Sequence, residues 1–296
     1  MNRLGHPARR HVQCAVEVYV SLAYKLLALD LDGTLIGNDL LVSDRVKGAV
    51  ARAEAAGVRV ALATGRMYRA SLPYAHELAI ITPLICYQGA LVRGVDNDDV
   101  IFHQPVPLES AREAIAEANR LGFVILGYVD DWCYASQDSP EAQFYARHSR
   151  VQPRFVGDLL AWLTTAPTKL VIVSTAEQTD VNVAHFRERF GDRLNVTKSY
   201  PLFTEIIHPD VSKGRALARL AELVGATRDE VAAVGDNLND LDMLVYAGLG
   251  IAMGNAAPDV KAQADWVCPP EADDGVAVAI EERILAGIPD GVAAGA

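Results

Sequence analysis

Residues 25–35 read KLLALDLDGTL, an apolar run that ends in two carboxylates, Asp30 and Asp32, followed at once by Gly33 and Thr34. The run has the length and composition of a strand that is buried on both faces of a sheet. Burial is unfavourable for an isolated anion, so a cation or hydrogen-bond donors must compensate the carboxylates. Taken alone, the motif also fits a plain acidic turn. The stretch therefore predicts a buried strand that ends in acidic side chains. Other parts of the sequence are needed to assign a role to these acids.

Strand and helix signals alternate on both sides of this stretch in the manner of a parallel sheet covered on both faces. VRVALATG at 58–65 and VAAVGD at 231–236 are further buried strands. Between about 91 and 208 the order changes to hairpins and helices, which predicts a second, mainly antiparallel sheet. We therefore expect an α/β protein with a doubly wound, Rossmann-like parallel-sheet core and an inserted α+β domain. The expected division is an N-terminal tail at 1–23, a core at 24–90 and 209–296, and an inserted domain at 91–208.

The composition excludes several classes of partner. The 296 residues are 51% hydrophobic and carry a formal net charge of −11, so a packed core is expected and non-specific binding to nucleic acid or anionic membranes is not. No apolar run reaches the roughly 18 residues that a membrane-spanning helix needs. The four cysteines are scattered and form no CxxC pair, which is typical of free thiols in a cytoplasmic protein. The sequence leaves open whether the protein forms a homo-oligomer.

Polar groups follow several of the predicted strands or begin the helices beside them. They are Asp30 with Asp32, Thr64 with Arg66, Lys213, and Asp236 with Asn239 and Asp240. Because active sites in open parallel sheets lie beyond the carboxyl ends of the strands, we expect these groups to converge. Each group by itself is weak evidence for a functional site. ATGR at 63–66 also fits a helix cap, and Lys213 also fits a solvated surface charge.

The converging groups have the chemistry of a site for a cation and an anion. The ATGR segment offers a hydroxyl and backbone amides at an expected helix N-terminus, where an anion is favoured. Asp30 is suited to act as a nucleophile or as a metal ligand. GDNLND at 235–240 gathers oxygen-bearing side chains in one loop, and Mg²⁺ prefers carboxylates together with water or substrate oxygens. Asp30 and Asp236 therefore predict a magnesium site.

The motifs DLDGTL, ATGR, SKG and GDNLND resemble, in order and in strand context, those of the haloacid dehalogenase superfamily of phosphohydrolases. GIAMGNA at 250–256, DGVAVAI at 274–280 and the insertion between the second and third motifs are similar to its Cof-type branch. The resemblance covers roughly residues 24–286. It implies that the inserted domain is a cap that sets specificity, while the core handles the phosphoryl group.

The resemblance also implies a role for each motif residue. Asp30 would attack phosphorus to form an aspartyl-phosphate, and Asp32 would protonate the leaving oxygen and then activate water. Mg²⁺ would be held by Asp30, the backbone carbonyl of Asp32, and Asp236. The substrate-binding set would be Thr64, Gly65, Arg66, Lys213 and Asn239, with Asp240 orienting Lys213 and nearby water.

Some residues stay outside this assignment. Gln88 stands in YQGA where the family often has Asn, and its longer reach is expected to alter contacts between core and cap, so it is not included in the site. Lys198, Tyr200 and Glu205, in TKSYPLFTE, are candidate contacts for the leaving group. His208 is more typical of a linker histidine than of a site residue.

The expected function is a Mg²⁺-dependent phosphatase of small phosphorylated metabolites, either sugar phosphates or phosphorylated cofactors such as flavin mononucleotide or pyridoxal phosphate. One alternative is a phosphotransferase or phosphomutase, in which a sugar hydroxyl accepts the phosphoryl group. Another is a non-catalytic phosphometabolite-binding protein. The presence of Asp30, Asp32, Lys213 and Asp236 together argues against such a binding protein, which would not need both Asp30 and Asp32.

Overall fold

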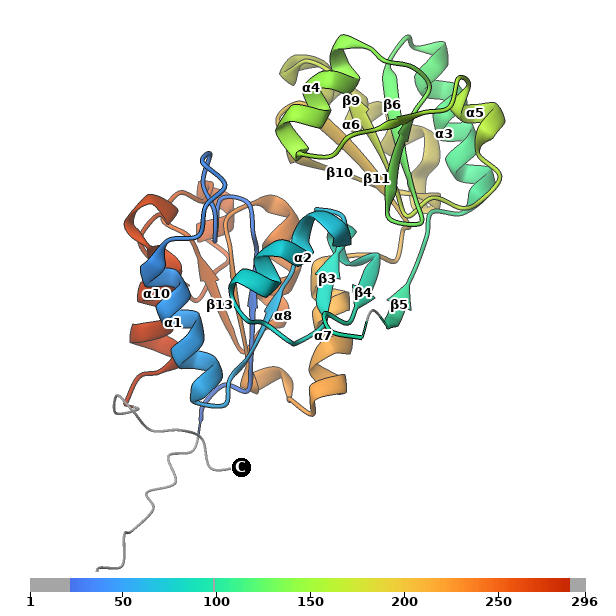
Figure 1. Cartoon of the computed structure of the whole chain (residues 1–296). Coiled ribbons are helices and arrows are strands. Elements are labelled where there is room, and N and C mark those ends of the chain that lie inside the picture. Colours follow the sequence, from blue (N-terminus) through green and yellow to red (C-terminus); the bar gives the residue numbers. More distant parts are fainter. Residues whose placement is uncertain (1–21, 98, 288–296) are drawn as a thin grey trace, which may run out of the picture.

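The computed structural model describes residues 22–97 and 99–287, whose strands form three sheets. In Figure 1 the five-stranded sheet with its helices lies at one end of the molecule and the six-stranded sheet with its helices at the other. All but the last two residues of the expected tail, 1–23, lie outside the described residues.

The five-stranded sheet is entirely parallel and has the order β14-β13-β12-β1-β2. Its strands are β1 (Leu26–Leu29), β2 (Arg59–Leu62), β12 (Val231–Gly235), β13 (Leu249–Ala252) and β14 (Trp266–Val267). The opening strand β1 is central, between β12 and β2, which explains why its sequence is apolar at every position. The predicted α/β core with a parallel sheet is confirmed.

Helices cover both faces of this sheet. Successive residues of a strand point to opposite sides, so each strand contributes side chains to the apolar cluster on either face. Leu27 and Leu29 of β1 belong to one apolar cluster, and Leu26 and Ala28 to another. The first cluster includes side chains of α1 (Asp44–Ala55), α2 (Tyr68–Glu77) and α10 (Gly275–Ala279), which leads into a π-helical turn at Ile280–Ile284. The second includes α7 (Lys213–Val224), α8 (Leu241–Tyr246) and α9 (Pro258–Lys261).

A small antiparallel sheet borders the parallel one. It consists of β3 (Leu84–Cys86), β4 (Leu91–Arg93) and β5 (Val100–His103), in that order. A bridge between Ala63 and Ile85 joins it to the end of β2. The hairpin expected at the start of the inserted segment is therefore formed, and it pairs with β3 and not with the six-stranded sheet.

The six-stranded sheet has the order β10-β11-β9-β6-β7-β8 and is antiparallel except for the pair β7 and β8. Its strands are β6 (Val124–Val129), β7 (Trp132–Ala135), β8 (Arg154–Phe155), β9 (Lys169–Val173), β10 (Asn195–Tyr200) and β11 (Phe203–Ile207). The helices of this part are α3 (Leu108–Arg120), α4 (Pro140–Ser149), α5 (Leu159–Trp162) and α6 (Ala176–Phe190).

The two faces of the six-stranded sheet have different partners. One face packs against α3, α5 and α6 around Ile115, Leu159 and Phe186. The other carries Tyr128 and Phe203, which share an apolar cluster with residues of the parallel sheet. This second face is therefore the one turned toward the carboxyl ends of β1 and β12.

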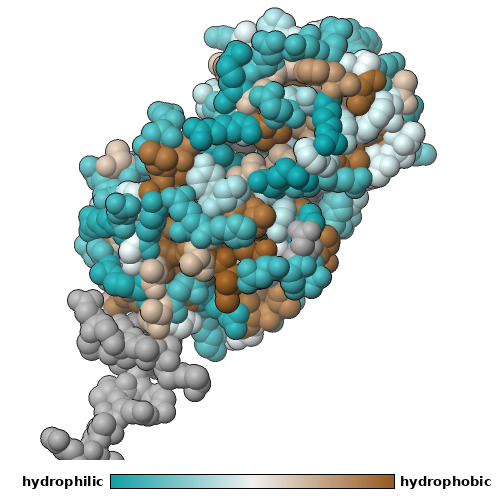
Figure 2. Space-filling model, in the orientation of Figure 1, coloured by the Kyte–Doolittle hydropathy of each residue, from teal (hydrophilic) through white to brown (hydrophobic). Residues whose placement is uncertain are grey.

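The surface face drawn in Figure 2 is mainly hydrophilic, with hydrophobic residues in small groups. Among the described helices none is both long enough and apolar enough to cross a membrane.

Candidate active site

Asp30 and Asp236 are brought together by strand pairing. Leu29 of β1 lies opposite Val234 of β12 in parallel register, and the Asp30 amide donates to the Val234 carbonyl at 3.0 Å. Both acids follow the carboxyl end of their strand. Carboxylate oxygens of Asp30, Asp236 and Asp240 lie within 4.8 Å of one another, so the expected convergence of the first and last motifs is present.

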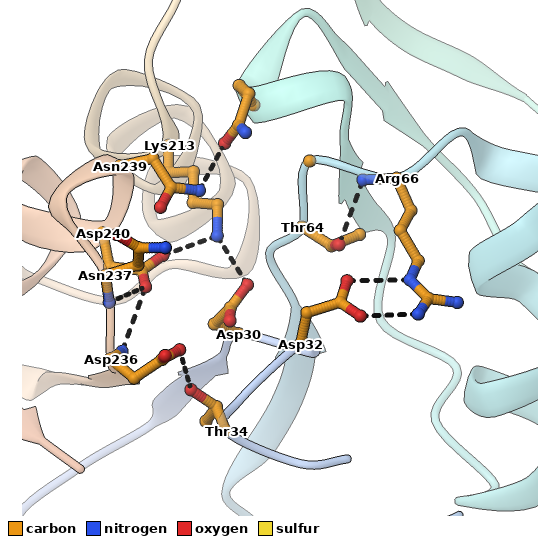
Figure 3. Close-up of polar contacts among 12 residues, drawn as sticks. Asp30, Asp32, Thr34, Thr64, Arg66, Lys213, Asp236, Asn237, Asn239 and Asp240 are labelled. Atoms are coloured by element: carbon orange, nitrogen blue, oxygen red, sulfur yellow. Dashed lines mark hydrogen bonds and ion pairs between the residues drawn. The ribbon is translucent and has the colours of Figure 1, made fainter. Parts of the chain in front are cut away.

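Lys213 enters this acidic cluster from the first turn of α7 (Figure 3). Its Nζ lies 2.6 Å from Asp30 Oδ1 and 2.5 Å from Asp240 Oδ1, and its side chain is fully buried. The other Asp240 oxygen accepts from the backbone amides of Asp236 and Asn237 at 3.1 and 3.0 Å. Asp240 therefore holds the ammonium and the β12 loop at once.

The charges in this cluster do not balance. Burial opposes the charge on Lys213, but Asp240 and Asp30 outweigh it and raise the pKa of the ammonium. Burial and then repulsion from Asp240 raise the pKa of Asp30 well above its usual range, against the attraction of Lys213. The same two causes raise the pKa of Asp236 to about 6. Three carboxylates around one ammonium leave an excess of negative charge that a divalent cation would neutralise.

Two residues of the opening stretch support Asp236. Thr34 Oγ1 donates to Asp236 Oδ1 at 3.1 Å. Gly33 has φ +82°, and a Cβ there would lie 2.4 Å from Asp236 Oδ2, so only glycine lets the turn pass so close to the carboxylate. Thr34 was not among the predicted site residues, although its place directly after DLDG is a signal for it.

The ATGR segment forms a loop, and α2 begins only at Tyr68. The Thr64 hydroxyl accepts from the Arg66 amide at 3.1 Å, while Met67 occupies the N-cap position. ATGR therefore lies directly before the N-terminus of α2, and Thr64 does not cap that helix. The Gln88 amide donates to the Thr64 carbonyl at 3.0 Å. Thr64 and Gly65 nevertheless lie close to the end of β2.

Arg66 faces Asp32 across the cleft mouth (Figure 3). Its Nε and Nη2 donate to the two oxygens of Asp32 at 2.8 and 2.5 Å, a bidentate pair. The Asp32 side chain is about half exposed, at 53%, whereas the Arg66 side chain is 12% exposed. The pair holds the Asp32 carboxylate beside Asp30 without burying it.

The predicted residues share one cleft of about 720 Å³ between the parallel sheet and the six-stranded sheet. Asp30, Asp32, Gly65, Arg66, Asp236 and Asn239 line it. Thr64, Lys213 and Asp240 are almost completely buried beside these lining residues. The six-stranded sheet and α4 contribute the opposite wall, with Tyr128, Tyr145, His148, Lys169, Tyr200, Phe203 and Glu205.

The candidates expected on the inserted segment are placed differently from one another. Tyr200 and Glu205 line the cleft. Lys198 instead pairs with Asp180 at the surface, with Nζ 2.5 Å from Oδ1. His208 lies outside the cleft lining, 3.0 Å from Gln104. Gln88, which was not among the predicted site residues, is buried and lines the cleft.

Comparison with known proteins agrees with the motif order. Residues 27–280 match the family model of the haloacid dehalogenase-like hydrolases. The chain is 30% identical over 271 residues to the pyridoxal phosphate phosphatase YbhA of Escherichia coli, covering 88% of this chain and 99% of that protein. It is 29% identical over 262 residues to the 5-amino-6-(5-phospho-D-ribitylamino)uracil phosphatase YitU of Bacillus subtilis, covering 87% and 96%.

The fold has solved counterparts as well. A crystal structure of a haloacid dehalogenase-like hydrolase from Bacteroides thetaiotaomicron superposes with a TM-score of 0.80 at 32% identity, covering 88% of this chain and 99% of that one. The family model, the relatives and the acidic cleft at the strand ends lead to the same conclusion. The chain belongs to the haloacid dehalogenase-like hydrolases and is a phosphatase.

Proposed function

We propose that this protein is a Mg²⁺-dependent phosphatase that hydrolyses small phosphorylated metabolites, sugar phosphates or phosphorylated cofactors, through an aspartyl-phosphate on Asp30. The observation that carries the proposal is the contact of Asp30 with the buried ammonium of Lys213, 2.6 Å away, in a cluster with the two further acids Asp236 and Asp240. A carboxylate attacks an anionic phosphate ester only if nearby cations neutralise the approach.

The reaction divides into two displacements at phosphorus. In the first, an oxygen of Asp30 forms a bond to phosphorus, the bond from phosphorus to the ester oxygen breaks, and Asp32 gives its proton to that oxygen. In the second, Asp32 takes a proton from water, the water oxygen bonds to phosphorus, and the bond to Asp30 breaks to release phosphate. One residue serves as acid and then as base, and its half-exposed position gives it access to both leaving group and water.

The phosphoryl group would be held by Thr64, Gly65, Arg66, Lys213 and Asn239. Lys213 brings a full positive charge to the buried side of the site. Arg66 is already paired with Asp32, so we propose that it also keeps the acid in place beside the leaving oxygen. The role proposed for Asp240 is to orient Lys213, to which it is hydrogen-bonded.

The residues present fit Mg²⁺. Asp30 and Asp236, with the backbone carbonyl of Asp32, would hold the ion. Asp30, Asp236 and Asp240 gather around the single ammonium of Lys213, so a divalent cation would offset the remaining negative charge. Asn239 Oδ1 is a buried acceptor that lacks a partner among the described residues, as expected beside a hydrated ion. When bound, Mg²⁺ would neutralise the phosphoryl oxygens and the nucleophile.

We further propose that residues 91–208 form the cap that selects the leaving group, inserted into a core of 24–90 and 209–296. Within that range the β4–β5 hairpin pairs with β3, so the part that faces the cleft begins after His103. The names of the two curated relatives, a pyridoxal phosphate phosphatase and a phosphatase of a ribitylaminouracil phosphate, support cofactor-related phosphate esters as substrates. A cytoplasmic location fits the three described cysteines, Cys86, Cys133 and Cys268, which are free and buried.

The test is phosphate release from a panel of phosphomonoesters by the parent protein and by Asp30→Asn. The parent is expected to turn over some members of the panel only with Mg²⁺, and EDTA should stop the reaction. Asp30→Asn should stay folded and be inactive, with no phosphate incorporated into the protein. Turnover by that variant, or turnover that survives thorough metal removal, would contradict the proposal. Labelled water distinguishes hydrolysis from transfer to a sugar hydroxyl.

A further inference from the structure

Gln88 joins the two walls of the cleft through its side-chain amide. Its Oε1 accepts from Asn239 Nδ2 at 2.9 Å, and its Nε2 donates to Glu205 Oε2 at 2.9 Å. Asn239 belongs to the loop after β12, whereas Glu205 lies in β11 of the six-stranded sheet. Gln88 is 3% exposed, so neither bond is weakened by competition with bulk water.

The backbone at Gln88 is rigidly placed. Tyr87 and Gln88 both have left-handed conformations, with φ of +53° and +61°, which are uncommon for residues other than glycine. The Tyr87 amide donates to the Arg66 carbonyl and the Gln88 amide to the Thr64 carbonyl, at 2.9 and 3.0 Å. These two bonds tie the turn to the ATGR loop and fix the point from which the Gln88 side chain extends into the cleft wall.

The other end of the link is a buried ion pair. Lys169 Nζ lies 2.7 Å from Glu205 Oε1, and the two residues are 3% and 4% exposed. Lys169 Nζ also donates to the Gly65 carbonyl at 2.7 Å. The pair thus directs one donor at the Gly65 loop and one acceptor at Gln88. A buried ion pair needs such additional hydrogen bonds to offset its desolvation.

The hydrogen bonds of Glu205 fix which way the side-chain amides of Gln88 and Asn239 point. A carboxylate can only accept, so Glu205 requires the Nε2 end of Gln88 to face it. The Oε1 end then faces Asn239, which in turn must present its Nδ2. The Oδ1 of Asn239 is thereby left as the remaining acceptor, and it is the buried atom that lacks a partner among the described side chains of the cleft.

We propose that Gln88 is a positioning residue that makes the orientation of Asn239 depend on the Lys169–Glu205 pair of the opposite wall. The inference rests on the proposed place of Asn239 beside the hydrated metal ion, because Oδ1 is an acceptor and cannot donate to a phosphoryl oxygen. Seating of the six-stranded sheet over the cleft places Glu205, Glu205 fixes the amide of Gln88, and Gln88 turns the Oδ1 of Asn239 toward the water shell of the ion. Gln88 itself touches neither substrate nor metal in this mechanism.

The test exchanges the amide of Gln88 with the carboxylate of Glu205. Gln88→Glu alone sets two carboxylates face to face, and Glu205→Gln alone removes the acceptor-only group that fixes the amide. In the double exchange, the carboxylate at 88 accepts from Asn239 and from the new amide at 205, whose oxygen accepts from Lys169. Each single variant is expected to lose at least about tenfold in kcat, since hydrogen bonds to charged groups are lost. The double exchange should recover most of that loss.

A third variant separates positioning from simple stability. Gln88→Met is expected to lower kcat in the parent but to have no further effect in an Asn239→Ala background, because Gln88 acts through Asn239. Gln143→Met is the matched control, since Gln143 donates to Asp138 at the exposed surface of α4. Equal losses in both backgrounds, parental kcat in Gln88→Met, or a double exchange no better than Gln88→Glu would overturn the proposal.

A readout without turnover keeps this outcome separate from the proposed function. The side-chain amide resonance of Asn239, assigned by its absence in Asn239→Ala, should shift in Gln88→Met and not in Gln143→Met. An unchanged resonance overturns the link even if the protein is an active phosphatase. A shifted resonance in a protein that hydrolyses no phosphomonoester supports the link and contradicts the proposed function.

Discussion

Lys213 Nζ lies 2.6 Å from Asp30 Oδ1, although 183 positions separate the two residues in the sequence. Both groups are buried, and Asp240 shares the ammonium at 2.5 Å. The contact is therefore the point at which the first and third motifs become one site. It also makes the stability of the core depend on the buried charge of Lys213.

Lys213→Met should damage both activity and stability. The variant leaves Asp30 and Asp240 buried without their cation, and removing one partner of a buried ion pair costs about 3–5 kcal/mol in the free energy of unfolding. Loss of the charge at the phosphoryl group should lower kcat by roughly 10²–10³. Thermal unfolding and phosphate release measure the two effects. A variant with parental stability would contradict the burial of an ionised cluster.

Asp32→Asn should impair the chemistry and leave the fold intact, because the Asp32 side chain is half exposed. General acid–base catalysis contributes roughly 10²–10⁴ in rate, and a loss of that size is expected for an alkyl phosphate. Para-nitrophenyl phosphate has a leaving group that needs no proton, so its first step should suffer much less. Burst-phase kinetics on the two substrates compare the steps. Equal losses in the first step would contradict the role of Asp32 as the acid.

Gly33→Ala should weaken metal binding specifically. A Cβ at this position would lie 2.4 Å from Asp236 Oδ2 and would push the carboxylate away. The Mg²⁺ concentration for half-maximal activity is expected to rise, with activity recovering as Mg²⁺ is added. Gly157→Ala is the matched control, because Gly157 has nearly the same φ, +84°, and its Cβ would meet nothing within 4 Å. If both variants change the Mg²⁺ requirement equally, the contact with Asp236 is not the cause.

Glu117→Gln should change how stability depends on acid. The hydrogen bond from Arg120, with further donation from His185, lowers the pKa of Glu117 from 4.5 to about 2. A carboxyl group with a lowered pKa in the folded state stabilises the protein above pH 4.5, and this contribution disappears as the pH falls toward about 2. The parent should therefore have the higher Tm at neutral pH, and the difference should shrink through that window. A difference that does not change with pH would contradict this account.

Sequence reasoning located most of the core and the chemistry-bearing residues, because their signals are local. A strand buried on both faces is apolar at every position, and acids placed directly after such strands stand out, as Asp30 and Asp236 do. Two short elements were not predicted, because segments of this length have no detectable hydrophobic period. They are the four-residue helix Leu159–Trp162 and the two-residue strand Arg154–Phe155. The reading of ATGR as a helix cap was not met, because Met67 takes the N-cap position of α2 and Thr64 instead accepts from the Arg66 amide.

Residue type and spacing were enough to predict the family, the parallel sheet and the order of four motifs along the chain, because each of these leaves a local pattern. Which atoms meet depends on tertiary packing. The examples are the bidentate hydrogen bonds of Arg66 to Asp32, the hydrogen bond of Thr34 to Asp236, and the link from Asn239 through Gln88 to Glu205. Glu205 and Gln88 are 117 positions apart. Their contact depends on how two sheets pack, and no local pattern encodes the direction in which an amide between them must point.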